Sequence, residues 1–204
     1  MTSDSRQTIV TLDLEGVLVP EVWIAVAERT GVEALRRTTR DEPDYDVLMR
    51  GRLRILDEHG LTMSLIGDVI GGLEPEPGAR EFLDDLRSRT QVMILSDTFE
   101  QFAAPLLRQL GMPVILCHRL VVENDRLVDY RLRQHDQKRR AVEALHGLNY
   151  RVIAAGDSYN DTAMLAEADC GILFRSPLHV QAEFPQFPAV DTYADLRDLI
   201  VAAL

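Results

Sequence analysis

The chain alternates short apolar runs with amphipathic segments, and this alternation is the feature that most constrains its fold. Five runs have the length and apolar content of buried strands. They are Thr8–Leu12, Gln91–Leu95, Val114–Cys117, Val152–Ala155 and Gly171–Phe174. Helical patterns follow most of them, at Phe99–Leu110, Lys138–Leu148, Asp161–Ala168 and Tyr193–Ala203. The repeated strand–helix order predicts an α/β protein with a parallel sheet that helices cover on both faces.

Two stretches interrupt this order. Between Pro20 and Pro77 no convincing strand is present, and Gly and Pro residues separate four predicted helices. These helices are expected at Glu21–Arg29, Val32–Thr38, Asp44–His59 and Met63–Ile70. We therefore expect a Rossmann-like, doubly wound core of residues 1–19 and 78–204 with a small helical-bundle cap, residues 20–77, inserted after the first strand. The second stretch, Leu120–Leu132, has two β-rich runs and predicts a hairpin that projects as a flap.

Length and charge narrow the classes of function. A chain of 204 residues fits one domain with an insertion. Its net charge of -11 disfavours nucleic acid and anionic membranes as partners. No apolar run reaches the roughly 18 residues that span a bilayer. The polar start, Met1–Gln7, lacks an apolar signal core, so we expect a cytosolic protein. Cys117 and Cys170 are expected to be reduced thiols.

Two carboxylates directly follow the first predicted strand. Ligands of parallel α/β sheets bind beyond the carboxyl ends of the strands, so these residues are candidates for chemistry. Asp13 or Glu15 could attack an electrophile while the other moves a proton. Gly16 allows a turn in which backbone N–H groups approach an anion. The alternative is an exposed acidic turn.

The other predicted strands also end in polar residues. Asp157 and Asp161 follow the fourth strand and, with Asp13, offer the hard oxygen ligands that Mg²⁺ prefers. The alternative is a Gly–Asp turn in which Asp161 caps a helix. Ser96, after the second strand, fits either a helix cap or an anion site. Lys138 opens a helix within a basic run, which taken alone fits a solvated surface.

Together these segments are much more specific than each alone. The motif positions, in chain order, are Asp13/Glu15/Val17, Ser96, Lys138 and Gly156/Asp157/Asp161. This order resembles the four motifs of the haloacid-dehalogenase superfamily of phosphotransferases over the whole chain, and the helical insertion resembles the first cap type of that superfamily. The segments LDLEGVLVPE, ILSDTF and GDSYNDTAML are similar to phosphoserine phosphatases. With PDYDVLMRGRLRILDEHGL, LRQHDQKR and FPQFPAV, the chain is similar to the bacterial subgroup of bifunctional phosphoserine phosphatases and homoserine phosphotransferases, whose motif has Glu at position 15 where the wider pattern has Asp.

The resemblance implies roles for the motif residues. Asp13 would be the nucleophile that forms an aspartyl-phosphate, and Glu15 would protonate the leaving oxygen and then deprotonate the acceptor. Mg²⁺ would be held by Asp13, Asp157 and the backbone carbonyl of Glu15, with Asp161 in support. The substrate-binding residues that it implies are Glu21, Arg52, Ser96, Asp97, Lys138 and Asn160. Lys138 would also take part in catalysis by holding the oxygens on which charge develops.

The resemblance also implies a substrate. Glu21 would receive the ammonium group of L-phosphoserine, and Arg52 would bind its carboxylate, with Arg50 and Arg54 as rival candidates. The enzyme would hydrolyse L-phosphoserine or transfer its phosphoryl group to L-homoserine; a homodimer is compatible with this reading. The alternatives are a phosphatase for another small phosphomonoester and a non-catalytic binding module. Trp23 is expected to be packing within the cap, and no role is expected for the five histidines.

Overall fold

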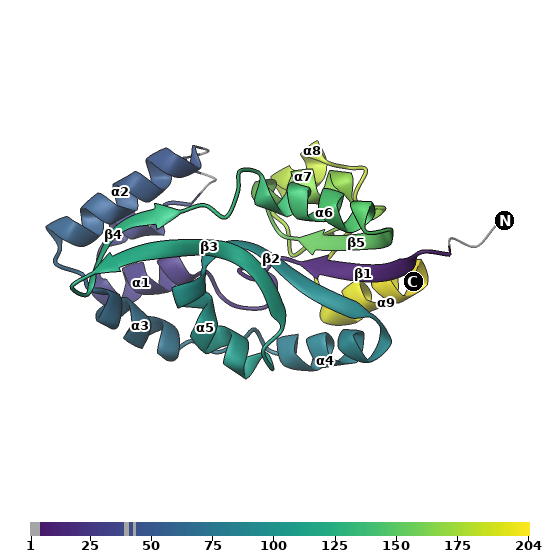
Figure 1. Cartoon of the computed structure of the whole chain (residues 1–204), viewed down its shortest axis with the longest axis horizontal. Helices are drawn as coiled ribbons and strands as arrows, with labels where there is room; N and C mark the ends of the chain where they lie inside the picture. The colour runs from purple at the N-terminus through teal and green to yellow at the C-terminus, as the bar shows by residue number, and fades with distance from the viewer. Residues whose placement is uncertain (1–4, 39–40, 43) are drawn as a thin grey trace.

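One seven-stranded sheet runs through the molecule, with strand order β4-β3-β2-β1-β5-β6-β7 (Figure 1). The computed structural model describes residues 5–38, 41–42 and 44–204. The strands are β1 Gln7–Leu12, β2 Gln91–Phe99, β3 Val114–Glu123, β4 Arg126–Arg131, β5 Tyr150–Gly156, β6 Cys170–Phe174 and β7 Ala189–Val190. Every neighbouring pair is parallel except β3 and β4. The predicted α/β fold with a largely parallel sheet is confirmed.

Helices cover both faces of the sheet, because consecutive strand residues point to opposite faces. On one face lie α4 Ala79–Arg89, α5 Glu100–Gln109 and α9 Tyr193–Ala203. On the other lie α6 Gln137–Gly147, α7 Thr162–Glu167 and α8 Leu178–Glu183 (Figure 1). Val10 and Leu12 of β1 belong to the first apolar core, whereas Ile9 belongs to the second. The sequence patterns described above do not predict α4 or α8.

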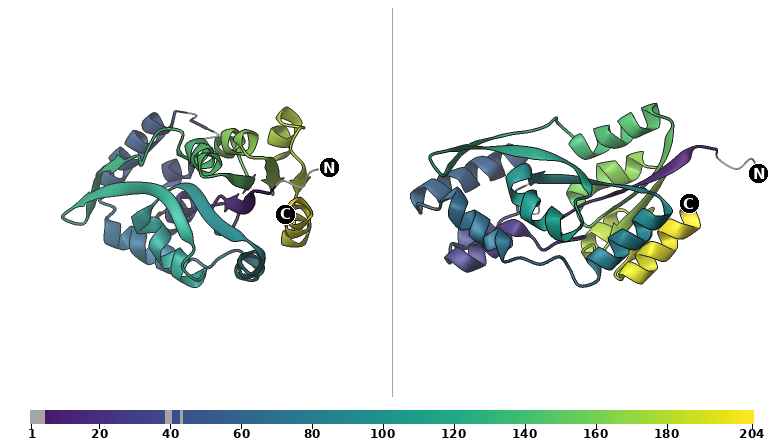
Figure 2. Two further views of the ribbon diagram at one scale, coloured as in Figure 1. Left: turned by 45° about the vertical axis from the view of Figure 1, so that its right-hand side comes forward. Right: turned by 60° about the horizontal axis from the view of Figure 1, so that its bottom comes forward.

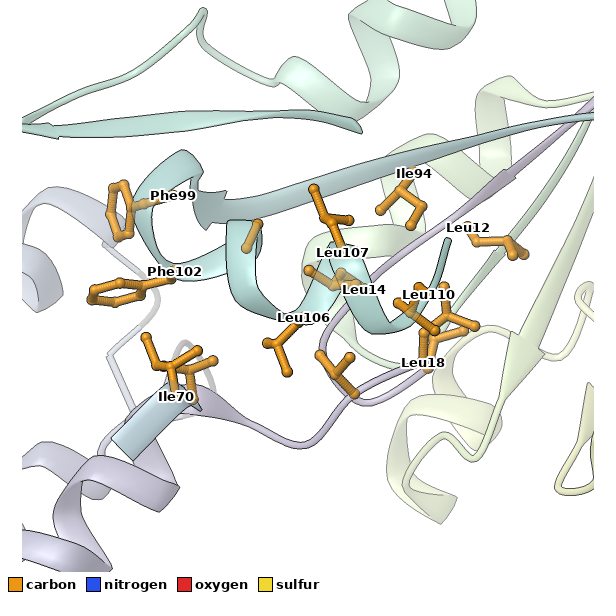
Figure 3. Close-up of a cluster of buried hydrophobic side chains, with 14 of the residues drawn as sticks. Leu12, Leu14, Leu18, Ile70, Ile94, Phe99, Phe102, Leu106, Leu107 and Leu110 are labelled. Atoms are coloured by element: carbon orange, nitrogen blue, oxygen red, sulfur yellow. The ribbon is translucent and has the colours of Figure 1, made fainter. Parts of the chain in front are cut away.

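The first apolar core continues from the sheet into the inserted helices. Figure 3 shows α5 beneath β2, with Leu106 and Leu110 on the side of Leu14 and Leu18, which follow β1. Farther along α5, Phe102 lies toward Ile70 of the insertion. These side chains are buried, so the loop that follows β1 rests on a packed apolar surface.

The insertion is helical, as predicted, and it lies at the end of the molecule away from the C-terminus in all views (Figure 2). Its helices are α1 Val22–Thr30, α2 Tyr45–Glu58 and α3 Met63–Gly71. Gly31 ends α1 in the left-handed conformation, and Asp44 and Thr62 cap the first N–H groups of α2 and α3. The helix predicted at Val32–Thr38 is only a 3₁₀ turn, Glu33–Arg36. Within the described residues no helix is long and apolar enough to cross a membrane.

The predicted hairpin is confirmed, but it does not project freely. β3 is continuous from the sheet to the hairpin, so the strand predicted at Val114–Cys117 and the first β-rich run are one element. Asn124 and Asp125 make a tight turn with φ of 48° and 63°. Asp125 then accepts hydrogen bonds from the start of α3, and Asp129 of β4 forms a 2.6 Å ion pair with Arg50 of α2. The hairpin is therefore held against the inserted helices.

Candidate active site

The segments that follow β1, β2 and β5 meet at one edge of the sheet. β1 lies between β2 and β5, which is the position where a crevice forms in a doubly wound sheet. Asp13 comes directly after β1, and Asp157 directly after β5. The strand predicted to end at Leu95 continues through Ser96 and Asp97 to Phe99, with a shift in its register against β3. An irregular strand end of this kind is common beside active sites, because it redirects side chains.

A buried lysine lies at the centre of the site. The Nζ atom of Lys138 lies 2.8 Å from Asp13 Oδ2, 2.8 Å from Asp161 Oδ1 and 3.8 Å from Asp97 Oδ2. Burial alone would lower the pKa of Lys138, but the three aspartates hold its pKa well above the ordinary value. The lysine is only 3% exposed and therefore carries a buried positive charge, so the solvated-surface interpretation of this residue is wrong.

Three buried carboxylates surround this ammonium group. Asp13, Asp157 and Asp161 each offer one oxygen, and these atoms lie within 4.8 Å of one another. Burial and mutual repulsion raise the pKa of Asp13 well above its ordinary value and the pKa of Asp157 to about 7. One lysine does not balance three carboxylates at this spacing, so the donor set fits a hard divalent cation such as Mg²⁺.

Asp161 holds the N-cap position of α7, but its side chain makes no capping hydrogen bond to that helix. Its side chain instead shapes the loop that precedes the helix. Its Oδ2 atom accepts the backbone N–H groups of Asp157 and Ser158, at 2.9 and 3.2 Å, in a capping box at the start of a 3₁₀ turn. Its other oxygen, Oδ1, accepts from Lys138. Asp161 thus shapes the loop that carries Asp157 and also belongs to the acidic cluster.

Two glycines allow the carboxylates to approach the backbone. Gly16 has φ of 75°, and a Cβ atom at this position would lie 2.6 Å from Asp157 Oδ2. A Cβ atom on Gly156 would collide with the side chain of Asp161. A side chain at either position would therefore displace a member of the acidic cluster.

One pocket opens beside this cluster and gathers most of the predicted site. It is lined by Asp13, Glu15, Glu21, Trp23, Thr38, Tyr45, Leu48, Arg52, Ser96, Asp97, Thr98, Asp157, Ser158 and Asn160. Eight of these residues are predicted site residues, from both the sheet and the insertion. The other two, Lys138 and Asp161, do not line the pocket but bond to Asp13 and Asp157, which do.

Among the three candidate arginines of α2, the structure brings Arg52 to the pocket. Arg50 and Arg54 lie on the surface in ion pairs with Asp129 and Glu58, whereas Arg52 is 7% exposed. Burial lowers the pKa of Arg52 to about 10, so its guanidinium stays charged near neutral pH. Within the described part of the chain, its hydrogen bonds go to a backbone carbonyl and a thioether, neither of which carries a negative charge.

The two glutamates of the pocket lie at the start of α1. Glu21 is the residue that precedes the helix, and Glu15 reaches the same helix end from the loop after β1. The Oε2 atom of Glu15 accepts the backbone N–H of Val22 at 3.1 Å. This hydrogen bond satisfies one of the free N–H groups of α1 and ties the insertion to the loop that carries Asp13.

Comparison with known proteins agrees with this geometry. Residues 8–169 match the model of the haloacid dehalogenase-like hydrolase family. The chain belongs to this family. It is 63% identical over 96% of its length to the phosphoserine phosphatase of Pseudomonas syringae, of which it covers 83%, and 64% identical over 93% of its length to the phosphoserine phosphatase ThrH of Pseudomonas aeruginosa, of which it covers 93%. The crystal structure of an apo phosphoserine phosphatase has the same fold, with a TM-score of 0.78 and 20% identity over 96% of this chain and 98% of that one.

In this haloacid dehalogenase-like hydrolase, the Asp97 carboxylate organises one wall of the pocket. It accepts from Gln137 Nε2 at 3.1 Å and from Asn160 Nδ2 at 3.2 Å, and His118 Nε2 lies 3.4 Å away. Burial alone would raise the pKa of Asp97, but Lys138 and these donors lower its pKa overall. The Asn160 amide is held at both ends, because its oxygen accepts from the hydroxyl of Ser158.

Three residues that contact Asp97 in this hydrolase site are absent from the sequence prediction. Gln137 and His118 bond to Asp97, and Tyr45 of α2 donates its hydroxyl to the Asp97 backbone carbonyl at 2.9 Å. The position of Gln137 beside Lys138 is the one sequence signal that could have pointed to it. His118 and Tyr45 come from the hairpin strand and the insertion, and only the tertiary fold brings them to Asp97.

Proposed function

We propose that the chain is an Mg²⁺-dependent phosphotransferase that hydrolyses L-phosphoserine through an aspartyl-phosphate on Asp13. One observation carries this proposal: a single pocket joins the buried acidic cluster to Glu21 and Arg52 of the insertion. The two relatives at 63% and 64% identity, both named phosphoserine phosphatase, support it. The structure of a phospho-aspartyl intermediate analogue of a phosphoserine phosphatase, 20% identical to this chain, has the same fold, with a TM-score of 0.78.

Asp13, Asp157 and Asp161 fit Mg²⁺ because they are hard oxygen donors whose charge Lys138 alone does not balance. When bound, the ion would neutralise negative charge that otherwise repels the phosphate from these carboxylates. The orientation of Asp13 comes from the protein itself. Its Oδ1 accepts from the backbone N–H of Leu14 at 2.7 Å, while Oδ2 bonds to Lys138.

The proposed reaction has two displacements at phosphorus. An Asp13 oxygen bonds to phosphorus as the bond to the serine oxygen breaks, and Glu15 donates a proton to that leaving oxygen. Glu15 then takes a proton from the acceptor, whose oxygen bonds to phosphorus and releases Asp13. Ser96 and Lys138 hold the phosphoryl oxygens, on which charge develops in both steps.

The serine part of the substrate is bound by the insertion. We assign its ammonium group to Glu21 and its carboxylate to Arg52, which line the same pocket. Glu15 and Glu21 lie near enough to attract the Arg52 guanidinium, but among the described residues neither accepts a hydrogen bond from it. Its buried N–H groups therefore gain most from a carboxylate ligand. In this scheme residues 20–77 act as a cap on a core of residues 1–19 and 78–204.

Transfer of the phosphoryl group to L-homoserine is the second part of the proposal. It is supported by Glu15, which has one methylene more than Asp and is anchored to α1 through Val22. A longer acid–base residue accommodates an alcohol acceptor that is bulkier than water. The cytosolic location stays a prediction, and so does the expectation that nucleic acid and membranes are not partners. The proposed reaction is compatible with a homodimer.

The test is to supply phosphoserine with Mg²⁺, with and without homoserine, and to separate the products. Phosphohomoserine would establish transfer, and serine with phosphate alone would leave a simple phosphatase. Asp13→Asn should abolish both reactions, and turnover at the wild-type rate in this variant would refute the nucleophile. If phosphoserine reacts no better than other phosphomonoesters, the chain is a phosphatase for a different small ester.

A further inference from the structure

Trp23 occupies an unusual position for a cap-packing residue. It is the second residue of α1 and only 6% exposed, and its indole packs edge-on against Phe102 with ring centroids 5.4 Å apart. Its burial and its contact with Phe102 agree with the packing role that the sequence predicts for Trp23. However, it also lines the active-site pocket together with Glu21 and Arg52.

The other partner of the indole is the guanidinium of Arg52, whose Cζ lies 4.6 Å from the ring centroid. The hydrogen bonds of Arg52 to described residues do not use all the N–H groups of its guanidinium. Nη2 donates to the Arg37 carbonyl at 2.7 Å and Nη1 lies 3.6 Å from the Met49 sulfur. Within the residues that the structure describes, the buried Nε has no hydrogen-bond partner.

This arrangement solves a problem of buried charge. An arginine removed from water needs a compensating partner, and a directly bonded protein carboxylate would be the usual one. Glu15 and Glu21 attract Arg52 electrostatically, but among the described residues neither is hydrogen-bonded to it. A directly bonded carboxylate would also occupy the N–H groups and cancel the charge that a substrate must use. An aromatic face attracts the cation through its quadrupole and leaves the N–H edge open.

We propose that Trp23 is a positioning residue that holds the Arg52 guanidinium open toward the pocket and thereby makes the site selective for phosphomonoesters that carry a carboxylate. The inference rests on the proposed function, which assigns the substrate carboxylate to Arg52. It adds the residue that maintains this selectivity.

The test compares two substrates that differ only in the carboxylate, phosphoserine and phosphoethanolamine. In Trp23→Leu, KM for phosphoserine should rise about 2- to 30-fold relative to KM for phosphoethanolamine. This factor corresponds to about 0.5–2 kcal/mol at 1.4 kcal/mol per tenfold, the range of a cation–π contact. Trp23→Phe, which keeps an aromatic face, should restore most of the ratio. The change should appear in KM rather than in kcat, because Asp13 and Glu15 are untouched.

Val26→Ala is the matched control. Val26 is buried on the same helix, one turn after Trp23, and does not line the pocket. This variant loosens the packing of α1 and should lower the melting temperature without changing the substrate ratio. A change of the ratio in Val26→Ala as large as in Trp23→Leu would show that Trp23 acts only through packing, and would overturn the proposal.

Fluorescence gives a second readout, because Trp23 is the single tryptophan of the chain. In Asp13→Asn, which prevents turnover, phosphoserine should change the tryptophan emission more than phosphoethanolamine does. This difference should disappear when Arg52→Met is added. Equal responses to both ligands in the presence of Arg52 would overturn the proposal.

The wild-type substrate preference distinguishes an error in the proposed substrate from an error in the role of Trp23. If the wild-type protein itself does not prefer phosphoserine over phosphoethanolamine, the proposed substrate is wrong, and the role of Trp23 in selectivity is wrong with it. If the wild type has the preference and Trp23→Leu keeps it, only the role of Trp23 is wrong and the proposed function stands.

Discussion

At the scale of single residues, Gly16 in the loop after β1 leaves no room for a side chain. We expect Gly16→Ala to reduce the affinity for Mg²⁺ by about 10- to 100-fold, the usual cost of disturbing a group that orients a metal ligand. The cause is the Asp157 carboxylate, 2.6 Å from the new Cβ, in addition to about 1–2 kcal/mol of left-handed backbone strain. An Mg²⁺ titration of phosphatase activity measures the effect.

Gly31→Ala is the control for this prediction. Gly31 has a similar φ of 71°, but a Cβ there meets nothing within 4 Å. This variant should show the strain as a lower melting temperature and leave the Mg²⁺ dependence as in the wild type. If both alanine variants bind Mg²⁺ alike, the close approach to Asp157 is not what Gly16 provides.

His118 gives a second prediction at this scale. Its Nδ1 accepts the Arg133 N–H at 3.1 Å, so its own proton lies on Nε2 and faces Asp97. His118→Phe keeps an aromatic ring beside Tyr45 and Phe99 but removes the donor. We expect kcat to fall about tenfold, because Asp97 orients Asn160 and lies near Lys138. His118→Gln, which supplies an N–H at a similar reach, should recover most of the loss.

A comparison of kcat with thermal stability separates positioning from packing at His118. If kcat is unchanged while the melting temperature falls, the histidine only fills space between the hairpin and α2. If Gln and Phe lower kcat equally, the Nε2 donor is not the relevant group.

Sequence patterns alone identify the residues that directly follow strands, because the end of a parallel strand fixes where its next side chains lie. Asp13 and Asp157 are examples, and both line one pocket. Ser96 lines the same pocket, but from within β2, which continues past the predicted strand end at Leu95. The Asp97 partners are different. His118 and Tyr45 reach Asp97 only through the packing of a hairpin and a helix far from it in sequence, and no periodicity contains that information.

At the scale of elements, the predicted bounds of strands and helices are wrong where tertiary contacts make an element longer or shorter than its sequence pattern indicates. β3 runs on past Cys117 because its outer half pairs with β4, and that pair packs on α2. The helix expected at Val32–Thr38 reduces to a 3₁₀ turn, and residues 39, 40 and 43, which follow it, lie outside the described residues. The helices α1, α2 and α3 are predictable because Gly31, Asp44 and Thr62 bound them with ordinary capping chemistry.

The contact between Glu15 and α1 gives a prediction for an entire element. Aspartate is one methylene shorter and, with the loop unmoved, would not reach the Val22 N–H, so Glu15→Asp should release α1 from the loop that carries Asp13. We expect a changed ratio of phosphoryl transfer to hydrolysis, with homoserine as acceptor, because the acid–base group shifts relative to the acceptor. Product separation at fixed phosphoserine and Mg²⁺ measures the ratio.

Glu15→Gln is the matched variant for this test. It keeps the length and the oxygen that accepts from Val22, and it loses the proton transfer, so both reactions should slow together by about 10²–10⁴-fold. An unchanged ratio in Glu15→Asp would mean that the anchoring of α1 does not decide the acceptor.

At the scale of the whole molecule, the net charge of -11 and an anionic substrate are compatible because the site differs from the surface. Part of the acidic excess is the buried cluster itself, which the proposed divalent cation would offset, and Lys138 and Arg52 add two buried positive charges beside it. The two apolar cores pack against either face of the sheet that carries this cluster. The raised pKa values of Asp13 and Asp157 indicate that the fold disfavours full ionisation of this cluster.

These raised pKa values predict how pH and Mg²⁺ act together on stability. The pKa values of Asp13 and Asp157 are raised in the folded protein, that of Asp157 to about 7 from an ordinary 3.8. A carboxyl with a raised pKa stabilises the fold at low pH, and this contribution is lost as the pH rises through the folded pKa. Mg²⁺ would bind the ionised carboxylates, so its stabilising effect should grow as the pH rises over the same interval.

We therefore expect Mg²⁺ to raise the melting temperature more at about pH 8 than at about pH 5.5, and chelation of the metal to destabilise the protein mainly at the higher pH. Thermal melts at both pH values, with and without Mg²⁺, measure the difference. Asp157→Asn removes one ionising carboxyl. This variant should reduce the rise in melting temperature that Mg²⁺ causes, and it should also make that rise less dependent on pH. If Mg²⁺ raises the melting temperature equally at both pH values, the cluster is already ionised at the lower pH without the metal. Lys138 and neighbouring donors would then balance its charge.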